Sequence, residues 1–261
     1  ALVIGSLGPK IHLPAAPLAE SEVRTVRDAI SHLPQLKAGE RDARDPSHQA
    51  PAHTRRILKL IRQIPPDGGD RRSLPPNLQL RCHAVVDGGG TPGFTDVYGR
   101  LRWDAPSVTI TAKSSTPSCG RFLHPEQDRN ISAREAGILQ GFPQNFIFEG
   151  PFVNKYRQIG EAVPPIFARF IAWQVLDYFY LHDRLNNKQL SVPAFNKQHC
   201  LPANSPGLVD AFCGAGGLSL GFEAAGFALR YAFDINSDAI ATFNANLTPR
   251  AEVADISRPN I

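Results

Sequence analysis

The stretch that decides the fold is Leu208-Val-Asp-Ala-Phe-Cys-Gly-Ala-Gly-Gly-Leu-Ser-Leu-Gly-Phe222. Its pattern predicts a short apolar strand over Leu208–Ala211, a glycine turn over Gly214–Gly217 and a helix over Leu218–Ala225. Glycine is favoured at such a turn because the backbone must bend tightly and let a ligand approach without a Cβ atom in the way. The first amides of the helix then point at the ligand and favour an anionic group.

The same alternation continues to the end of the chain. Ala228–Phe233 predicts a second strand that ends at Asp234, Ser237–Asn246 predicts a second helix, and Val253-Ala254 begins a third strand. Strands that alternate with helices are typical of a doubly wound parallel sheet. The predicted fold class is therefore α/β, with a Rossmann-like parallel sheet that is only partly present.

Acidic residues follow two of these strands at the same edge of the sheet. Asp234 comes about 20 residues after Gly214, where a carboxylate can bind a ribose diol, and Asp255 could meet an adenine amino group. Together they favour an adenosine-bearing cofactor. A nicotinamide cofactor is the rival, but its phosphate motif needs a third glycine where this chain has Ser219. A tight turn with no ligand is the other alternative.

The composition is that of an ordinary folded protein. Of the 261 residues, 42% are hydrophobic and 20% are charged, which excludes general disorder. No apolar run approaches the ~18 residues of a membrane span, and no secretory signal opens the chain. The chain contains no methionine and opens with an apparent strand, Ala1–Gly5, so we expect a fragment of a longer protein. The cysteines show no metal-ligand spacing, so we expect no metal site, no disulfide scaffold and a reducing cytoplasm; they are Cys82, Cys119, Cys200 and Cys213.

Positive charge is concentrated in the first half of the chain. Residues 1–129 hold 18 lysines and arginines against 13 acidic residues, and residues 130–261 hold 10 against 11, in line with the net charge of +4. A basic half joined to a near-neutral half suggests contact with a polyanion, although a solvated arginine-rich surface is the alternative. A basic amphipathic helix is expected over Thr54–Ile64 and carries three of the candidate contacts. The candidates are Arg55, Arg56 and Lys59 on this helix, and Arg71, Arg72, Arg100 and Lys113 elsewhere.

Local signals define the remaining elements. Ser132-Ala-Arg-Glu135 is a capping box and predicts the start of a helix, which should end near Gln140 because Gly141-Phe-Pro143 follows. The other expected elements are a helix over Ser21–Leu33, a strand over Ser107–Thr111, a helix over Val163–Tyr180 and a linker over His182–Pro206.

Several of these segments resemble motifs of the DNA (cytosine-5) methyltransferase family. Asp210-Ala-Phe-Cys-Gly-Ala-Gly-Gly217 resembles the S-adenosylmethionine-binding motif I, Asp234 matches the acid of motif II, and Asp255-Ile256 matches motif III. Arg129-Asn-Ile-Ser-Ala-Arg-Glu-Ala-Gly-Ile-Leu-Gln-Gly-Phe-Pro143 is similar to motif IX, and Tyr156-Arg-Gln-Ile-Gly-Glu-Ala-Val-Pro-Pro165 to motif X. The segments Tyr98–Pro106 and Gly120–Gln127 resemble the part just before motif IX.

The order of the motifs departs from the usual family order. Motifs IX and X precede motifs I to III here, as in circularly permuted members or at the junction of two fused enzymes. The resemblance implies five segments: 1–15 as the end of a catalytic-domain strand, 16–150 as a smaller mixed α+β target-recognition domain, 151–182 as a motif X helix returning to the catalytic domain, 183–206 as a linker, and 207–261 as the start of the catalytic domain.

The family's catalytic motifs are absent from this sequence. The family's nucleophile is the cysteine of a Pro-Cys-Gln motif, and neither this motif nor Glu-Asn-Val nor Gln-x-Arg-x-Arg occurs in the chain. In the family, the thiolate adds to C6 of a cytosine flipped out of the duplex, and C5 then takes the methyl group. We therefore expect no catalytic residue in this chain, and we assign Cys213, in the cofactor turn, to a structural role.

The resemblance also implies partners and site residues. The expected partners are S-adenosyl-L-methionine, double-stranded DNA with a flipped cytosine, and a missing catalytic half, in the bacterial cytoplasm at the nucleoid; a non-catalytic DNA-binding or regulatory subunit is the alternative. Glu161 replaces the usual asparagine of motif X, where it could repel the cofactor's carboxylate or pair with its ammonium group. The cofactor residues are Phe212, Gly214, Gly216, Gly217, Asp234, Ile235, Asp255, Ile256, Glu161, Ala162 and Val163, and the DNA-binding residues are Arg55, Arg56, Lys59, Arg100 and Lys113.

Overall fold

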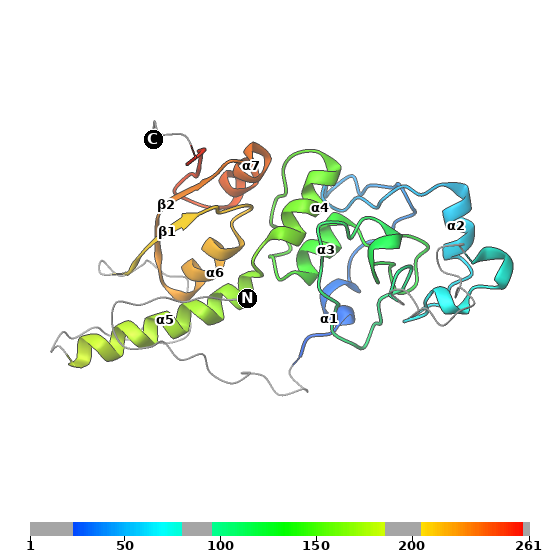
Figure 1. The fold of residues 1–261 in the computed structure, drawn as a ribbon, viewed down its shortest axis with the longest axis horizontal. Coiled ribbons are helices and arrows are strands. Elements are labelled where there is room, and N and C mark those ends of the chain that lie inside the picture. The colour runs from blue at the N-terminus through cyan, green and yellow to red at the C-terminus, as the bar shows by residue number, and fades with distance from the viewer. Residues whose placement is uncertain (1–22, 80–95, 186–204, 258–261) are drawn as a thin grey trace. The chain divides into compact units, whose positions relative to one another are not determined.

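The computed structural model describes residues 23–79, 96–185 and 205–257 (Figure 1). These residues form two compact units, which meet in the sequence between Glu161 and Ala162. We call the described residues up to Glu161 the irregular unit and those from Ala162 onward the sheet unit. The expected strand at Ala1–Gly5 and most of the expected linker lie outside the described residues.

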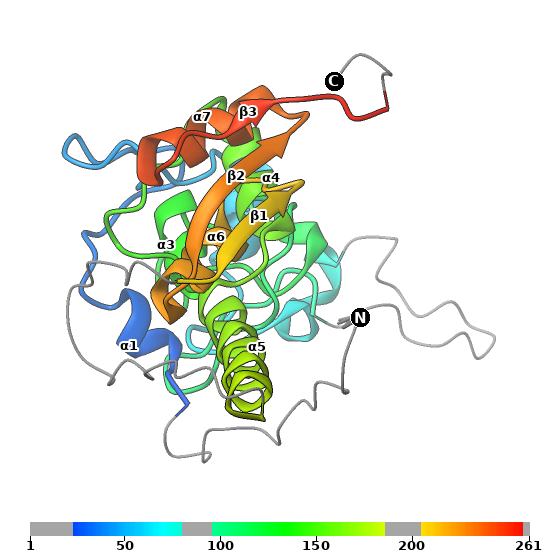
Figure 2. The same ribbon diagram turned by 90° about the vertical axis from the view of Figure 1, so that its left-hand side faces the viewer.

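The sheet unit contains a three-stranded parallel sheet. Its strands, β1 (Gly207–Ala211), β2 (Ala228–Asp234) and β3 (Glu252–Val253), lie side by side in that order (Figure 2). The first two strands and the position of the third confirm the prediction from sequence. A small parallel sheet with connecting helices is the arrangement expected for part of a Rossmann-like fold.

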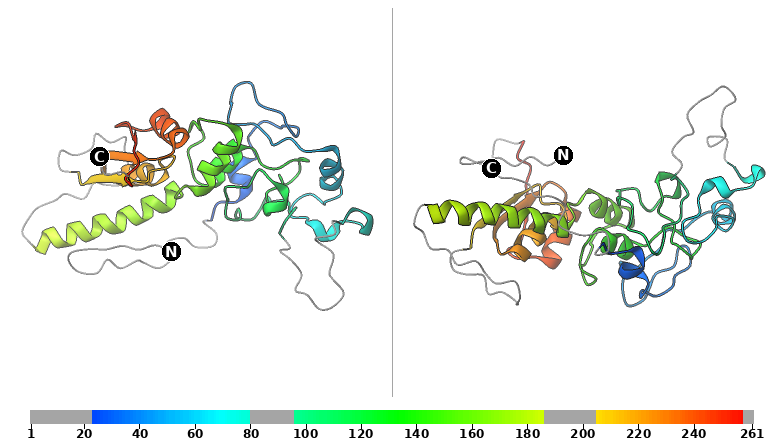
Figure 3. Two further views of the ribbon diagram at one scale, coloured as in Figure 1. Left: turned by 45° about the horizontal axis from the view of Figure 1, so that its top comes forward. Right: turned by 90° about the horizontal axis from the view of Figure 1, so that it is seen from below.

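Three helices pack in this unit. α6 (Gly217–Ala225) follows β1, α7 (Ser237–Asn246) follows β2, and the long helix α5 (Pro165–Leu185) runs beside α6 (Figure 3). The close approach of α5 and α6 requires Gly221, since a Cβ atom there would overlap the backbone of α5. A buried cluster between the sheet and α7 consists of Cys213, Leu229, Ala232, Ile240, Phe243, Leu247 and Ala251.

The irregular unit is built from short helices and loops. Its α-helices are α1 (Val26–Ile30), α2 (Arg55–Ile61), α3 (Ala133–Leu139) and α4 (Phe152–Glu161), and its 3-10 turns are η2 (Arg71–Ser73), η3 (Pro76–Leu78) and η5 (Pro117–Cys119). The capping box before α3 is confirmed: the Ser132 hydroxyl accepts from the Glu135 N–H, and the Glu135 carboxylate accepts from the Ser132 N–H. α4 packs on α3 and belongs to this unit, whereas the sequence-based division began the returning segment at residue 151.

The expected strand over Ser107–Thr111 is wrong. This segment has no strand partner among the described residues, where the unit shows only isolated bridges such as Arg100 with Leu123. A β-branched alternating segment becomes a strand only when another strand pairs with it. Here the backbone of Thr111 and Ala112 instead lies against Gly160 of α4, so closely that a Cβ atom on Gly160 would overlap it.

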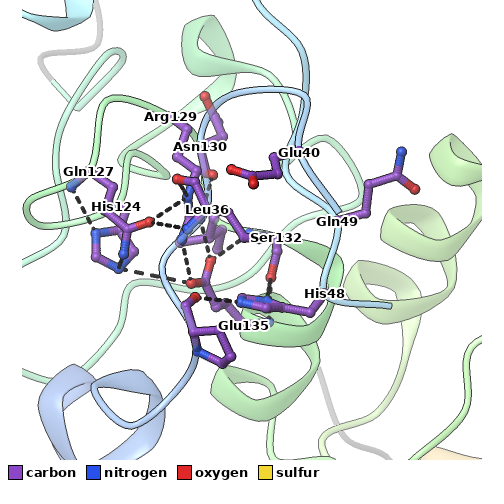
Figure 4. Close-up of polar contacts among 12 residues, drawn as sticks. Leu36, Glu40, His48, Gln49, His124, Gln127, Arg129, Asn130, Ser132 and Glu135 are labelled. Carbon is purple, nitrogen blue, oxygen red and sulfur yellow. Dashed lines mark hydrogen bonds and ion pairs between the residues drawn. The ribbon is translucent and has the colours of Figure 1, made fainter. Parts of the chain in front are cut away.

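A buried network of charged and polar side chains holds the irregular unit together (Figure 4). The Arg129 guanidinium donates to both carboxylate oxygens of Glu135, at 2.7 and 2.8 Å, and both side chains are almost fully buried. His48 bridges the Ser132 hydroxyl and the Pro34 carbonyl, at 2.9 and 2.8 Å. Arg129 also donates to the Leu36 and Asn130 carbonyls, so the network satisfies backbone groups that no sheet pairs here.

Candidate functional site

The glycine turn between β1 and α6 has an unusual backbone. Phe212, Gly214 and Gly216 have φ angles of 61°, 53° and 92°, in the left-handed region that favours glycine. A Cβ atom on Gly216 would lie 2.5 Å from the Leu247 side chain, so packing as well as conformation requires glycine there. A Cβ atom on Gly214 would meet nothing within 4 Å. The turn is therefore packed behind Gly216 and open at Gly214, as a ligand-binding turn must be.

Asp234 closes the turn from the end of β2. Its carboxylate accepts from the Gly214 N–H at 2.9 Å and from the Asn236 N–H at 2.8 Å. The sequence places Gly214 after the first strand and Asp234 at the end of the second, and the structure brings these two residues into contact. Each oxygen retains a second lone pair, so the carboxylate could accept further hydrogen bonds from a diol.

Other predicted cofactor residues lie at the carboxyl ends of the same three strands. Phe212, Ile235 and Ile256 expose large apolar side chains, at 66%, 64% and 53%. Asp255 accepts from the N–H and the hydroxyl of Ser257, at 3.1 and 2.6 Å. An edge with exposed apolar side chains and carboxylates can bind a ligand with an aromatic base and a polar sugar.

Three predicted cofactor residues lie at the division between the two units. Glu161 ends α4 with its carboxylate exposed and ion-paired to Arg157 at 3.0 Å, and Ala162 and Val163 follow it. The partner of Glu161 was not foreseen from the sequence, although its spacing of four residues on a helix was visible. The cofactor roles of these three residues stay predictions.

Cys213 is a buried thiol behind the turn. Burial raises its pKa to about 12, and the nearby carboxylates of Asp210 and Asp234 add to the rise. A nucleophilic cysteine needs the opposite environment, one that stabilises the thiolate. Cys119 is free and exposed, while Cys82 and Cys200 lie outside the described residues.

Four of the five predicted DNA-binding residues have exposed side chains. Arg55, Arg56 and Lys59 lie on α2, and Lys113 lies in the loop after the segment expected as a strand. Among the described residues none of the four forms an ion pair, so their charges are available to a partner.

The prediction for Arg100 is corrected. Its side chain is buried, with 1% of the residue exposed, and its guanidinium donates to the Asp128 carboxylate at 2.6 Å. The same group donates to four backbone carbonyls, those of Ile61, Ile64, His124 and Gln127. All five of its N–H donors are therefore used internally, and Arg100 organises the irregular unit rather than contacting phosphate. Of the two further candidates, Arg72 pairs with Asp70 and Arg71 is buried.

The described residues contain no cluster of metal-ligating side chains and no helix that is both long and apolar enough to cross a membrane.

Comparison with known proteins identifies the family. The sequence profile described as C-5 cytosine-specific DNA methylase matches residues 47–177 and 207–261, well over half of the chain. The chain is 39% identical to the type II methylase M.HgiDII of Herpetosiphon aurantiacus over 166 residues, which are 62% of the chain and 46% of that protein. It is 34% identical over 158 residues to the type II methyltransferase M1.HphI of Haemophilus parahaemolyticus, covering 60% and 38%, and 33% identical over 178 residues to M.Eco47II of Escherichia coli, covering 66% and 39%.

The matches thus span less than half the length of these curated relatives. The matched residues include the glycine turn, its carboxylate Asp234 and the capping box of α3. The glycine turn follows β1 and Asp234 ends β2, as the sequence predicted, and the hydrogen bond from the Gly214 N–H to the Asp234 carboxylate is an addition from the structure. The chain belongs to the C-5 cytosine-specific DNA methylase family.

Proposed function

We propose that this chain is part of a DNA (cytosine-5-)-methyltransferase, which transfers a methyl group from S-adenosyl-L-methionine to C5 of cytosine in a specific DNA sequence. The chain would supply residues that bind the cofactor and, in the region 16–150, the part that recognises DNA. The observation that carries the proposal is the Gly214–Asp234 hydrogen bond beneath a turn with open space above it. Relatives named type II methylases suggest a bacterial restriction–modification system, at work in the cytoplasm on the nucleoid DNA.

The residues of the turn fit an adenosylated cofactor. Asp234 has unused lone pairs for the ribose hydroxyls, and Phe212 and Ile235 offer apolar surface for the adenine ring. When bound, S-adenosyl-L-methionine supplies the electrophilic methyl group. The chain's own contribution is to bind and orient it. A nicotinamide cofactor would leave the matched segment before α5 without a role.

A binding experiment tests the cofactor assignment. The full chain should bind S-adenosylhomocysteine in calorimetry, and Asp234→Ala should weaken binding by about 1.5–3 kcal/mol because a charge-assisted hydrogen bond is lost. Asp238→Ala, which removes a carboxylate from the first turn of α7, is the matched control and should leave the affinity unchanged. Equal binding by the wild type and Asp234→Ala would reject the site.

A salt titration tests the DNA-recognition part. Changing Arg55, Arg56 and Lys59 together to glutamine should reduce the slope of log affinity against log salt by about 3 units, if all three contact phosphate. Arg27→Gln is the control, because Arg27 is exposed but already paired with Asp104. An unchanged slope in the triple variant would make α2 an ordinary surface helix.

A regulatory or non-catalytic subunit is the second candidate, since the sequence lacks the Pro-Cys-Gln motif. The chain alone should transfer no methyl group to DNA under either hypothesis. Mixing it with a separately produced fragment that carries the Pro-Cys-Gln, Glu-Asn-Val and arginine motifs should restore transfer if the two are parts of one permuted or split enzyme. Methyl transfer by this chain alone, abolished by Cys213→Ser, would contradict the proposal and make Cys213 the nucleophile.

A further inference from the structure

A buried acid near the carboxyl end of β1 has no role in the function proposed above. Asp210 is the fourth residue of β1, only 2% of it is exposed, and its position is paired with the fully buried Ala232 of β2. A carboxylate in such surroundings is costly unless strong hydrogen bonds compensate it. Burial indeed raises the pKa of Asp210, and hydrogen bonds from Ser219 oppose the rise. The partners of this carboxylate therefore matter more than those of a surface acid.

The partner of Asp210 lies in the first turn of α6. The Ser219 hydroxyl donates to the Asp210 carboxylate at 2.5 Å, and the Ser219 side chain is fully buried. The residue before α6, Gly216, has no side chain with which to cap the helix. Asp210 thus supplies, from the neighbouring strand, a negative charge beside the first turn of α6, where the helix dipole favours one.

The glycine turn lies between these two bonded residues. Phe212, Gly214 and Gly216 of the turn all have left-handed φ angles, which glycine adopts readily but which cost free energy at Phe212 unless surrounding contacts hold it. Asp234 holds the middle of the turn through the Gly214 N–H. The Asp210–Ser219 bond holds its two ends, because it joins the strand before the turn to the helix after it.

We propose that Asp210 is a positioning residue for the cofactor: through the Ser219 hydroxyl it fixes the start of α6 against β1 and so holds the glycine turn in the form that binds the donor. This inference rests on the proposed function. An apolar pair would pack the helix on the strand equally well, whereas a charged hydrogen bond fixes one distance and one direction. A small shift of a binding loop is enough to lose much of an interaction.

Paired substitutions at Ser219 separate positioning from packing. Ser219→Ala keeps the packing but removes the donor, whereas Ser219→Thr keeps the donor but adds a methyl group to a fully buried site. We expect Ser219→Ala to weaken S-adenosylhomocysteine binding about tenfold or more at a temperature where every variant is folded, and Ser219→Thr to stay within about threefold of the wild type. Thr242→Val, which removes another fully buried hydroxyl from α7, should change the melting temperature but not the affinity.

Two results would contradict the positioning role of Asp210. If affinity follows melting temperature, with Ser219→Thr binding as weakly as Ser219→Ala or more weakly, the bond is only structural and the proposal is overturned. Equal binding by the wild type and Ser219→Ala overturns it as well. Asp210→Asn combined with Ser219→Ala should bind no more weakly than the weaker single variant, because the two residues act as one unit.

A measurement without ligand separates this proposal from the proposed function. In Ser219→Ala, amide hydrogen exchange at Gly214–Gly217 should be at least about tenfold faster than in the wild type, with α7 unchanged. If the wild type does not bind S-adenosylhomocysteine at all, the proposed function fails while this exchange result still tests the bond. Unchanged exchange in the turn would overturn the positioning role even if the cofactor binds.

Discussion

Replacing Glu135 with glutamine should destabilise the irregular unit far more than replacing Asp104 with asparagine. Both carboxylates form two hydrogen bonds to one arginine at similar distances: Glu135 to Arg129 at 2.7 and 2.8 Å, and Asp104 to Arg27 at 2.6 and 3.0 Å. They differ in burial, since the Arg129 and Glu135 side chains are 0% and 1% exposed, against 48% and 72% for Arg27 and Asp104. The two pairs form a matched test of burial.

The magnitudes follow from what each substitution leaves behind. In Glu135→Gln the Arg129 charge stays buried without a counter-charge, which costs about 3–5 kcal/mol. In Asp104→Asn the Arg27 guanidinium is free to return to water, so the expected loss is about 0–1 kcal/mol.

Urea unfolding followed by tryptophan fluorescence is the assay. The protein has two tryptophans, Trp103 in the irregular unit and Trp173 in α5 of the sheet unit. In a Trp173→Phe background, fluorescence therefore reports the irregular unit alone, and the slope against urea must stay constant for the comparison to hold. Equal losses for Glu135→Gln and Asp104→Asn, or a loss below about 1 kcal/mol for Glu135→Gln, would refute the argument.

Three further outcomes follow from the same structure. Burial lowers the pKa of His124 to about 4, so between about pH 6.5 and pH 4 the unfolded chain binds a proton at this imidazole and the folded chain does not. The free energy of unfolding should therefore fall by about 3 kcal/mol from pH 7 to pH 4, as measured by urea titrations. The fall should be smaller in His124→Asn. Gly160→Ala should lower the melting temperature, although alanine normally favours a helix by up to ~1 kcal/mol, because its methyl group would overlap the backbone at Ala112. Gly214→Ala should stay folded but lose S-adenosylhomocysteine binding in calorimetry, whereas Gly216→Ala should lose stability as well, because only Gly216 has neighbours within 4 Å.

The sheet unit was largely predictable because its signals are local. The helix over Ser237–Asn246 has the predicted bounds, and Asn236 caps it through its side chain. The helix from Gly217 ends at Gly226, whose φ of 108° is the left-handed conformation of a glycine cap. Helix caps of this kind depend on a few neighbouring residues, so the helix ends could be located without knowing any contact distant in the sequence.

The irregular unit was less predictable because its partners are distant in sequence. Whether the segment at Ser107–Thr111 forms a strand depends on what lies beside it, and α4, some 50 residues later, lies there instead of another strand. Arg100 illustrates the same limit: its carbonyl partners are 24 to 39 residues away, and nothing in the neighbouring residues marks it as buried. The Asp210–Ser219 bond, by contrast, joins residues nine apart, but a buried acid in a strand is not a pattern that sequence alone reveals.

The arginines of the irregular unit therefore fall into two populations that composition cannot separate. Arg100, Arg129 and Arg134 are buried and donate to backbone carbonyls and to carboxylates of the unit itself. A unit with few sheet ladders must satisfy its buried carbonyls in another way, and guanidinium groups with five donors each can do so. Arg55 and Arg56 on α2 have exposed side chains and no ion pair among the described residues. Because only arginines of this second kind can release counterions from DNA, the salt dependence of binding should be smaller than the basic first half of the sequence suggests.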